Sequence, residues 1–231
     1  MSAEETNRPN QLPFRLPLRL QIWRATLRFV FRVIFRILCR IQVNGLEHVP
    51  LGKPYIIAYN HISLFEPPMV LAFWPEIPEA VAGADVFERP GQKILVRAYR
   101  AIPVHRGEYD RAVIDTMLEI LRVGRPLVIA PEGGRSHEPA LRRARAGVAY
   151  LVDRAQVPVV PVGIVGTSDD TLKEILRGQR PRLEMNIGKP FMPPPIEGQG
   201  AARRKARQEN ADMVMRRIAE LIPEAYRGVY K

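Results

Sequence analysis

The sequence predicts an α/β fold in which helices flank a largely parallel central sheet, preceded by a basic amphipathic helix. The sheet is indicated by an alternation along the chain, because short apolar runs of strand length are followed by longer segments with helical periodicity. The preceding helix is indicated by residues 18–42, where an arginine recurs every fourth residue within an aromatic and aliphatic segment. A chain of 231 residues suits one such domain with an appended segment.

Composition narrows the class of protein. A hydrophobic fraction of 46% is ordinary for a chain with a real core. The lone cysteine, Cys39, excludes an internal disulfide framework and fits a reducing compartment. The cysteine and the four histidines do not have the spacing of zinc ligands. The net charge of +11 favours an anionic partner. Because no nucleic-acid-binding motif is present, a membrane surface is the expected partner and neither nucleic acid nor a metal is expected.

The N-terminal segment divides into two parts. Residues 1–13 are polar and interrupted by proline, and we expect them to be mobile. Residues 18–42 contain no apolar run long enough to span a bilayer, so a helix lying in the membrane interface is predicted, with its arginines reaching the phosphate headgroups. The alternative is a helix packed on the domain with its arginines in water. The arginines in question are Arg24, Arg28, Arg32, Arg36 and Arg40.

The chain is organised around a polar turn between two apolar segments. Residues 55–59 predict a buried strand, and a helix is predicted to begin at or near Pro68. The turn between them holds His61 and Glu66, and it can fold the carboxylate back onto the imidazole, as in a general base held by an orienting acid. The alternative is a helix-capping role, because Ser63 and Glu66 have the spacing of a capping box.

The remaining elements follow in order. Two proline residues, Pro158 and Pro161, indicate that the apolar strand containing them is an edge strand or carries a bulge. A turn is predicted at residues 43–45, and strands are predicted at 79–83, 102–104, 127–130, 157–165 and 183–187. Helices are predicted at 91–100, 109–123 and 201–222, and a further helix is predicted to end at residue 155.

Two loops carry candidate anion-binding groups. Arg106 precedes Gly107, and a guanidinium suits bidentate contact with phosphate; the alternative is a surface arginine paired with Glu108 or Asp110. The loop at residues 131–136 follows a buried strand, at the sheet edge where ligands usually bind. It contains Glu132, Gly133 and Arg135, and the alternative there is a plain glycine turn with a Glu132–Arg135 pair.

Four stretches together resemble a known family. They are Asn60-His61, residues 101–107, residues 131–136 and residues 157–162, and they have the order and rough spacing of the four motif blocks of glycerophospholipid acyltransferases. The chain looks like the 1-acyl-glycerol-3-phosphate acyltransferases of this family over residues 43–195. Two departures are visible, because Glu66 stands where the family usually has aspartate and Gly134 stands where it usually has threonine.

The resemblance implies a function and roles for named residues. It implies acyl transfer from acyl-CoA or acyl-ACP, as co-substrate and without a further cofactor, to the hydroxyl of 1-acyl-glycerol-3-phosphate, giving phosphatidic acid. It implies His61 as base, Glu66 as its orienting acid, and Arg106 with Glu132, Gly133 and Arg135 around the acceptor phosphate. Residues 1–42 form the tail and interfacial helix, and 43–231 the acyltransferase domain.

The resemblance leaves other functions open. In one alternative, the chain is an acyltransferase whose acceptor is another lysophospholipid or a lyso-aminolipid. In the other, it is a catalytically weak membrane-binding protein of the same fold. The expected partners are the lysophospholipid, the acyl thioester, an anionic membrane surface and an acyl carrier protein. The expected location is the cytoplasmic face of the cell membrane, in a peripheral position.

Overall fold

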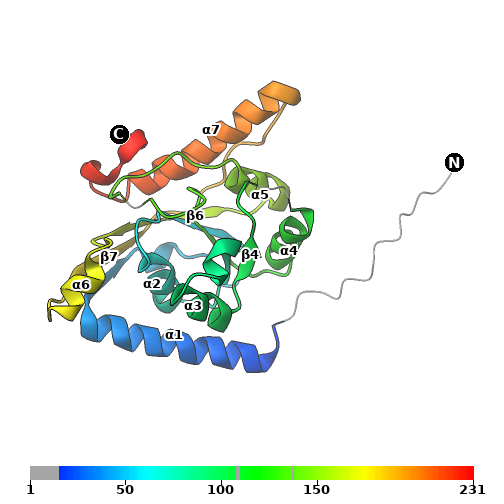
Figure 1. Cartoon of the computed structure of the whole chain (residues 1–231). Helices are drawn as coiled ribbons and strands as arrows, with labels where there is room; N and C mark the ends of the chain where they lie inside the picture. The colour runs from blue at the N-terminus through cyan, green and yellow to red at the C-terminus, as the bar shows by residue number, and fades with distance from the viewer. Residues whose placement is uncertain (1–15, 108–109, 137) are drawn as a thin grey trace.

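A seven-stranded sheet with the order β1-β7-β6-β2-β5-β3-β4 forms the centre of the protein (Figure 1). The computed structural model describes residues 16–107, 110–136 and 138–231, so the expectation for residues 1–13 lies outside the described residues. All neighbouring strands are parallel except β6 and β7, which confirms the largely parallel sheet. The strands are β1 (Arg40–Asn44), β2 (Ile56–Tyr59), β3 (Glu79–Gly83), β4 (Ile102–Val104), β5 (Leu127–Ile129), β6 (Val159–Val165) and β7 (Arg182–Ile187).

Helices cover both faces of the sheet. Successive side chains of a strand point to opposite faces. On β2, Ile56 and Ala58 join a core with α4, α5 and α7, whereas Ile57 and Tyr59 join a second core with α1 and α2. The helices are α1 (Leu18–Leu38), α2 (Glu66–Phe73), α3 (Gln92–Tyr99), α4 (Arg111–Arg122), α5 (Gly147–Ala155), α6 (Thr171–Leu176) and α7 (Gly200–Ala219), with 3-10 turns η1 (Leu46–His48), η2 (Ala84–Phe87), η3 (Glu224–Tyr226) and η4 (Gly228–Tyr230).

The strand containing Pro158 and Pro161 is an interior strand, so its prediction as an edge strand is wrong. β6 lies between β2 and β7. The pairing beside Pro161 is irregular, but the extra residue is not in the proline-containing strand: Val162 pairs with Ile187 and Val159 pairs with Phe191, so the additional residue lies in the partner segment 187–191. Pro161 lies inside this irregular stretch, where its missing N–H costs no regular ladder bond to β7.

The helix α1 is present but ends at Leu38, before the predicted residue 42. Three of the five arginines, Arg24, Arg28 and Arg32, do not face water or headgroups, whereas Arg36 is exposed on α1 and Arg40 is exposed on β1. Arg24 is 1% exposed and pairs with Glu79 at 2.8 Å. Arg28 donates to the backbone oxygens of Leu71 and Trp74, and Arg32 donates to that of Ala72. Those carbonyls are at the C-terminal end of α2, where a helix leaves its last oxygens unpaired and favours positive charge. Arg24, Arg28 and Arg32 therefore anchor α1 to the domain.

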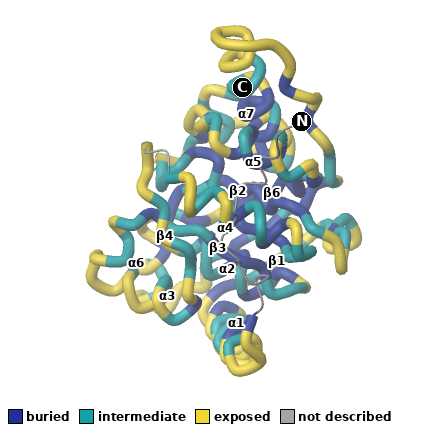
Figure 2. Tube along the Cα trace, turned by 90° about the vertical axis from the view of Figure 1, so that its right-hand side faces the viewer, coloured by how far each residue is buried: buried dark blue, intermediate teal, exposed yellow. Residues whose placement is uncertain are grey.

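The opposite side of α1 is apolar and exposed. Figure 2 shows exposed residues along α1 at the lower end of the molecule. No helix among the described residues is long and apolar enough to cross a membrane. The large apolar side chains exposed on α1 are Leu18, Ile22, Trp23, Phe29, Val30, Val33, Ile34, Ile37 and Leu38.

Candidate active site

His61 and Glu66 are in contact at the carboxyl end of β2. The Nδ1 atom of His61 lies 3.0 Å from Oε2 of Glu66, so the turn predicted between them does fold the carboxylate onto the imidazole. A carboxylate can only accept, so Nδ1 carries the proton and Nε2 is left as an acceptor. The imidazole also lines a large cavity. This is the arrangement of a histidine base with a partner that fixes its tautomer.

Glu66 is fully buried and has several donors. Its carboxylate accepts from the backbone N–H of Ser63 at 2.9 Å, from the Ser63 hydroxyl at 3.0 Å, and from the hydroxyl of Thr167. Burial alone would raise the pKa of Glu66, but hydrogen bonds from His61, Thr167 and Ser63 outweigh burial and hold that pKa below its ordinary value. Glu66 is therefore ionised beside His61 at neutral pH.

The capping alternative for Ser63 and Glu66 holds in part. Glu66 accepts from the Ser63 N–H, as in a capping box, but the helix begins at Glu66 itself and its N-cap is Phe65. The start is two residues before the predicted Pro68, and both prolines lie in the first turn, where no N–H partner is required. One carboxylate therefore fixes the turn and contacts the imidazole.

Asn60 ties the catalytic turn to the sheet, a role not predicted from the sequence. Its side-chain amide donates to the backbone oxygen of Ile164 at 2.9 Å and accepts from the N–H of Ile164 at 2.7 Å. The two bonds replace a pair of ladder bonds at the point where β2 ends beside β6. Because His61 follows Asn60 directly, these two bonds to β6 also fix the backbone of His61.

Glu132 supports the backbone of His61 from the neighbouring loop. Its buried carboxylate accepts from the N–H of His61 at 3.1 Å and from the N–H of Arg142 at 3.0 Å. Burial raises the pKa of Glu132, and the N–H groups of Arg142 and His61 oppose that rise. The Glu132–Arg135 pair of the alternative interpretation is not formed, because Glu132 pairs with Arg142 at 3.7 Å. Glu132 therefore positions His61, and its predicted contact with the acceptor phosphate stays a prediction.

Arg135 points away from His61. Its guanidinium pairs with Asp169 at 3.1 Å and lines a second cavity of about 480 Å³ beside α1 and α6. Arg135 and Glu132 do not line the cavity that holds His61, whereas Gly133 and Gly134 do. Of the loop residues predicted to position phosphate, only Gly133 reaches this cavity, and the role of Arg135 stays a prediction that its geometry does not favour.

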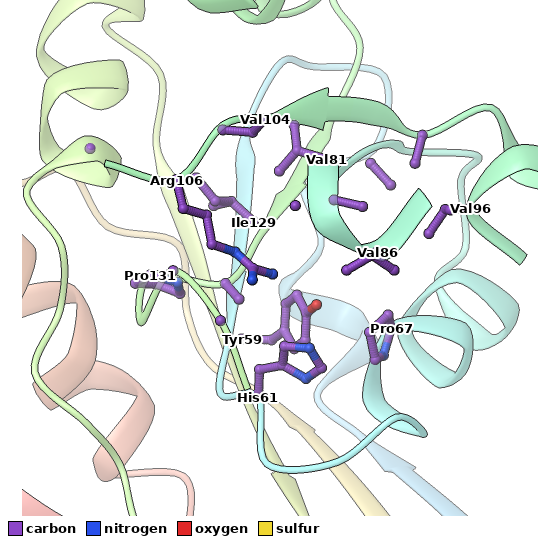
Figure 3. A pocket seen from close by; sticks show the side chains of 18 of the residues that line it. Tyr59, His61, Pro67, Val81, Val86, Val96, Val104, Arg106, Ile129 and Pro131 are labelled. Atoms are coloured by element: carbon purple, nitrogen blue, oxygen red, sulfur yellow. The ribbon is translucent and has the colours of Figure 1, made fainter. Parts of the chain in front are cut away.

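Arg106 does reach the cavity of His61. In Figure 3 it extends from the end of β4 toward Tyr59 and His61. Its guanidinium pairs with Asp85 at 3.1 Å and lies over the backbone of Gly83, where an added Cβ would come within 2.5 Å of it. The alternative partner Glu108 lies outside the described residues, and the side chain of Asp110 instead caps α4. Asp85 was not predicted, because it is distant in sequence.

The cavity containing His61 and Arg106 has a volume of about 990 Å³, within the range of small-molecule sites. Most of its lining is apolar, as Figure 3 shows for Val81, Val86, Val96, Val104 and Ile129. Leu27 and Phe31 of α1 border it on one side. Among residues 16–107, 110–136 and 138–231, no cluster of side chains suits a metal ion. The site combines a base, a cation and room for an apolar chain.

Comparison with known proteins identifies similar sequences and folds. Residues 40–165 match the family described as Acyltransferase. A Caenorhabditis elegans protein named as a candidate 1-acyl-sn-glycerol-3-phosphate acyltransferase is 30% identical over 112 residues, which are 47% of this chain and 43% of that protein. The human 1-acyl-sn-glycerol-3-phosphate acyltransferase alpha is 23% identical over 161 residues, 68% of this chain and 56% of that protein. The chain thus spans about half the length of the curated relatives it matches.

A solved structure shares the fold. The crystal structure of the 1-acyl-sn-glycerophosphate (LPA) acyltransferase PlsC from Thermotoga maritima matches with a TM-score of 0.59 and 20% sequence identity. The match covers 83% of this chain and 78% of that chain. At this identity the likeness supports the arrangement of helices around the sheet.

Proposed function

We propose that this chain, which belongs to the Acyltransferase family, moves a fatty acyl group from a thioester to the free hydroxyl of 1-acyl-glycerol-3-phosphate. The observation that carries the proposal is the 3.0 Å contact between His61 and Glu66, at the edge of an apolar cavity that also holds Arg106. The names of the matched relatives support this acceptor. The product is phosphatidic acid.

The chemistry needs one base and no covalent intermediate. Nε2 of His61 takes the proton of the acceptor hydroxyl as its oxygen attacks the thioester carbonyl carbon. Glu66 holds the tautomer and stabilises the imidazolium that forms. As the tetrahedral intermediate collapses, the carbon–sulfur bond breaks and the imidazolium returns the proton to the thiolate. A base placed in this way contributes about 10²–10⁴ in rate.

The direct test is a transfer assay with purified protein, acyl-CoA and a panel of acceptors. We expect 1-acyl-glycerol-3-phosphate to be the preferred acceptor. Preference for an acceptor with another headgroup would favour the alternative lysophospholipid or lyso-aminolipid substrates. Failure to acylate any acceptor in the presence of lipid vesicles would contradict the enzymatic proposal and favour a membrane-binding protein of the same fold.

The acceptor phosphate is assigned to Arg106. Arg106→Ala is expected to lower kcat/KM for the acceptor by the equivalent of about 2–4 kcal/mol, because a charge-assisted contact in an apolar cavity is lost. Arg106→Lys should recover only part of the activity, since the bidentate fork is absent. Steady-state kinetics with varied acceptor measure both variants.

Arg89 provides the matched control for this substitution. It pairs with the same carboxylate, Asp85, at 2.6 Å but does not line the cavity. Arg89→Ala should therefore leave acceptor kinetics within about twofold of the wild type, as expected for an exposed ion pair. If Arg106→Ala behaves like Arg89→Ala, the phosphate assignment is wrong.

We further propose that α1 places the protein on the membrane with its apolar side, on the cytoplasmic face of the cell membrane as expected above. The support is the exposure of Leu18, Phe29 and Ile37, which are 71%, 64% and 63% exposed on one continuous helix. Leu27 and Phe31 of the same helix border the cavity, so a lipid acceptor has a short path from the bilayer to His61. Apolar insertion takes the place of the headgroup contacts expected of Arg24, Arg28 and Arg32, whereas the exposed Arg36 remains available for such a contact.

Charged substitutions on this side of α1 test the membrane proposal. The Phe29→Asp and Ile37→Asp double variant should lose binding to phosphatidylcholine vesicles by about tenfold or more, because each buried side chain is worth roughly 1.5–3 kcal/mol. Binding of the wild type should persist at high salt, since apolar insertion is not screened. Vesicle co-sedimentation measures both effects.

The control substitution is Val229→Asp, at a side chain that is 68% exposed near the C-terminus and outside α1. It should bind vesicles as the wild type does. Point substitutions are preferable to deletion of residues 1–42, because deletion also removes Arg24 from the buried carboxylate of Glu79. Equal vesicle binding by the α1 double variant and the wild type would refute the role of α1.

A further inference from the structure

Two arginines line the cavity at the side away from α1. Arg145 lies two residues before the start of α5, and Arg207 lies on α7. Both border the cavity whose other side is formed by Leu27 and Phe31. Figure 1 shows α5 and α7 at the opposite end of the molecule from α1. The mechanism above gives neither arginine a role.

Arg207 is held in place but lacks an acidic partner among the described residues. Its guanidinium stacks over the ring of Tyr150 at 4.9 Å, and its Nε is buried without a hydrogen-bond partner. The adjacent Gln208 fixes this turn of α7 by donating to the backbone oxygen of Ala144 at 3.0 Å. A buried donor without a partner costs free energy, and a bound anion would satisfy it.

Arg145 is positioned by the motif loop. Its backbone N–H donates to the oxygen of Pro131 at 2.8 Å, and its side chain crosses Gly133, where an added Cβ would lie 2.4 Å from the Arg145 Cδ. The structure gives Arg145 no carboxylate partner within the described part of the chain. The first turn of α5, which also lines the cavity, adds a smaller positive potential. Two guanidinium groups from separate elements therefore share one end of the cavity.

We propose that Arg145 and Arg207 bind the phosphate of the acyl donor's carrier, at a subsite that adjoins Arg106 in the same cavity. The proposal rests on the proposed function, because an acyl thioester must reach His61 together with the acceptor. Coenzyme A and the prosthetic group of acyl carrier protein both carry a phosphate on pantetheine, and arginine suits phosphate by its planar fork. The two arginines take no part in the bond changes; they position the thioester.

The positions of Arg106 and of the Arg145–Arg207 pair in the cavity indicate which substrate each binds. The apolar side of α1 admits a lipid acceptor from the bilayer. Arg106 lies against Gly134 and Arg145 lies against the neighbouring Gly133, so these two cations flank one loop. A water-borne carrier cannot enter through the bilayer, so it approaches from the α5 and α7 end, where Arg145 and Arg207 lie. Each substrate is thus assigned its own cation within one cavity.

The test compares donors with and without phosphate. Arg207→Gln and Arg145→Gln should each raise KM for acyl-CoA by about tenfold, as for loss of a charge-assisted hydrogen bond, and leave KM for the acceptor within about twofold. With acyl-pantetheine, which has no phosphate, the variants and wild type should have equal KM. Arg204→Gln, an exposed position on α7 outside the cavity, is the matched control and should change neither KM.

Further donors identify the source of the phosphate. An equal rise in KM for acyl-phosphopantetheine, acyl-CoA and acyl carrier protein assigns the contact to the pantetheine phosphate, whereas a rise for acyl-CoA alone assigns it to the nucleotide phosphates. Either result supports the subsite. A rise in acceptor KM, an equal loss with acyl-pantetheine, or no change in any KM overturns it.

Direct binding separates this proposal from the proposed function. Calorimetry with coenzyme A, without acceptor, should show about tenfold weaker binding to Arg207→Gln than to wild type. Unchanged binding overturns the subsite whether or not turnover is observed. Weakened binding together with a wild-type protein that acylates no acceptor would instead contradict the proposed function and leave the subsite supported. Thermal unfolding of each variant confirms that the fold is intact.

Discussion

Replacing Glu66 by glutamine is expected to lower kcat by about 10²- to 10⁴-fold with little change in KM. The neutral amide keeps the size of the side chain but no longer stabilises the imidazolium, and its NH₂ group allows the wrong tautomer of His61. The carboxylate is fully buried and accepts from Ser63, Thr167 and His61, so no water can replace it. Steady-state kinetics measure the loss of turnover, and thermal unfolding measures separately any loss of stability.

Three companion variants make this prediction specific. His61→Ala should be at least as damaging as Glu66→Gln, and the double variant should be little worse than His61→Ala, because the two residues act as a unit. Glu66→Asp should also lose activity, since the 3.0 Å contact depends on the longer side chain reaching back from the first turn of α2. Near-full activity of Glu66→Gln beside an inactive His61→Ala would show that Glu66 serves only the fold.

Replacing Glu79 by alanine is expected to reduce the free energy of unfolding by about 3–5 kcal/mol, because it leaves a buried charge without its partner. Glu79 is buried and contacts Arg24 at 2.8 Å and Arg125 at 2.9 Å. Arg24 lies over the ring of Tyr99 at 4.5 Å and cannot turn to water without detaching α1. Denaturant unfolding measures the loss.

The exposed pair of Glu88 and Arg97 offers a matched comparison. These side chains are 3.4 Å apart and both are exposed, so Glu88→Ala should change stability by no more than about 1 kcal/mol. A small effect of Glu79→Ala, similar to that of Glu88→Ala, would mean that α1 is held by its apolar contacts and by the bonds of Arg28 and Arg32 alone.

Local chemistry made the catalytic turn predictable. Two prolines after Glu66 restrict where α2 can begin, and the turn that remains brings a carboxylate to a histidine only five positions away. Arg106 was predictable for a similar reason, because a short strand ends directly before it. The contact of His61 with Glu66 depends on neighbours in sequence, whereas the contact of Arg106 with Asp85 does not.

Contacts between distant segments were not predictable. Arg135 was expected near Glu132, but its partner is Asp169 and the partner of Glu132 is Arg142. β1 was missed because its sequence, which includes Arg40 and Gln42, lacks an apolar run; pairing with β7 defines it as a strand. The interior position of β6 likewise depends on β7, and the irregular pairing beside Pro161 depends on the segment 187–191 that follows β7.

The burial of Arg24, Arg28 and Arg32 was not predicted, and the cause of this error is physical. Periodicity shows that a helix has an apolar side and an arginine side, but it does not show which of the two sides packs against the rest of the chain. Here the unpaired carbonyls at the end of α2 and the carboxylate of Glu79 take the arginines. A polar side can be the buried side when its partners are concentrated at one helix end.

This inverted helix has a consequence for handling the protein. In aqueous buffer without lipid, the apolar side of α1 is a patch of Ile22, Phe29, Val33 and Ile37 with nothing in the described chain covering it. Contiguous apolar patches of this kind drive self-association. The purified protein should therefore form oligomers at high concentration that mild detergent disperses, and the apparent mass in light scattering should fall to that of one chain above the critical micelle concentration.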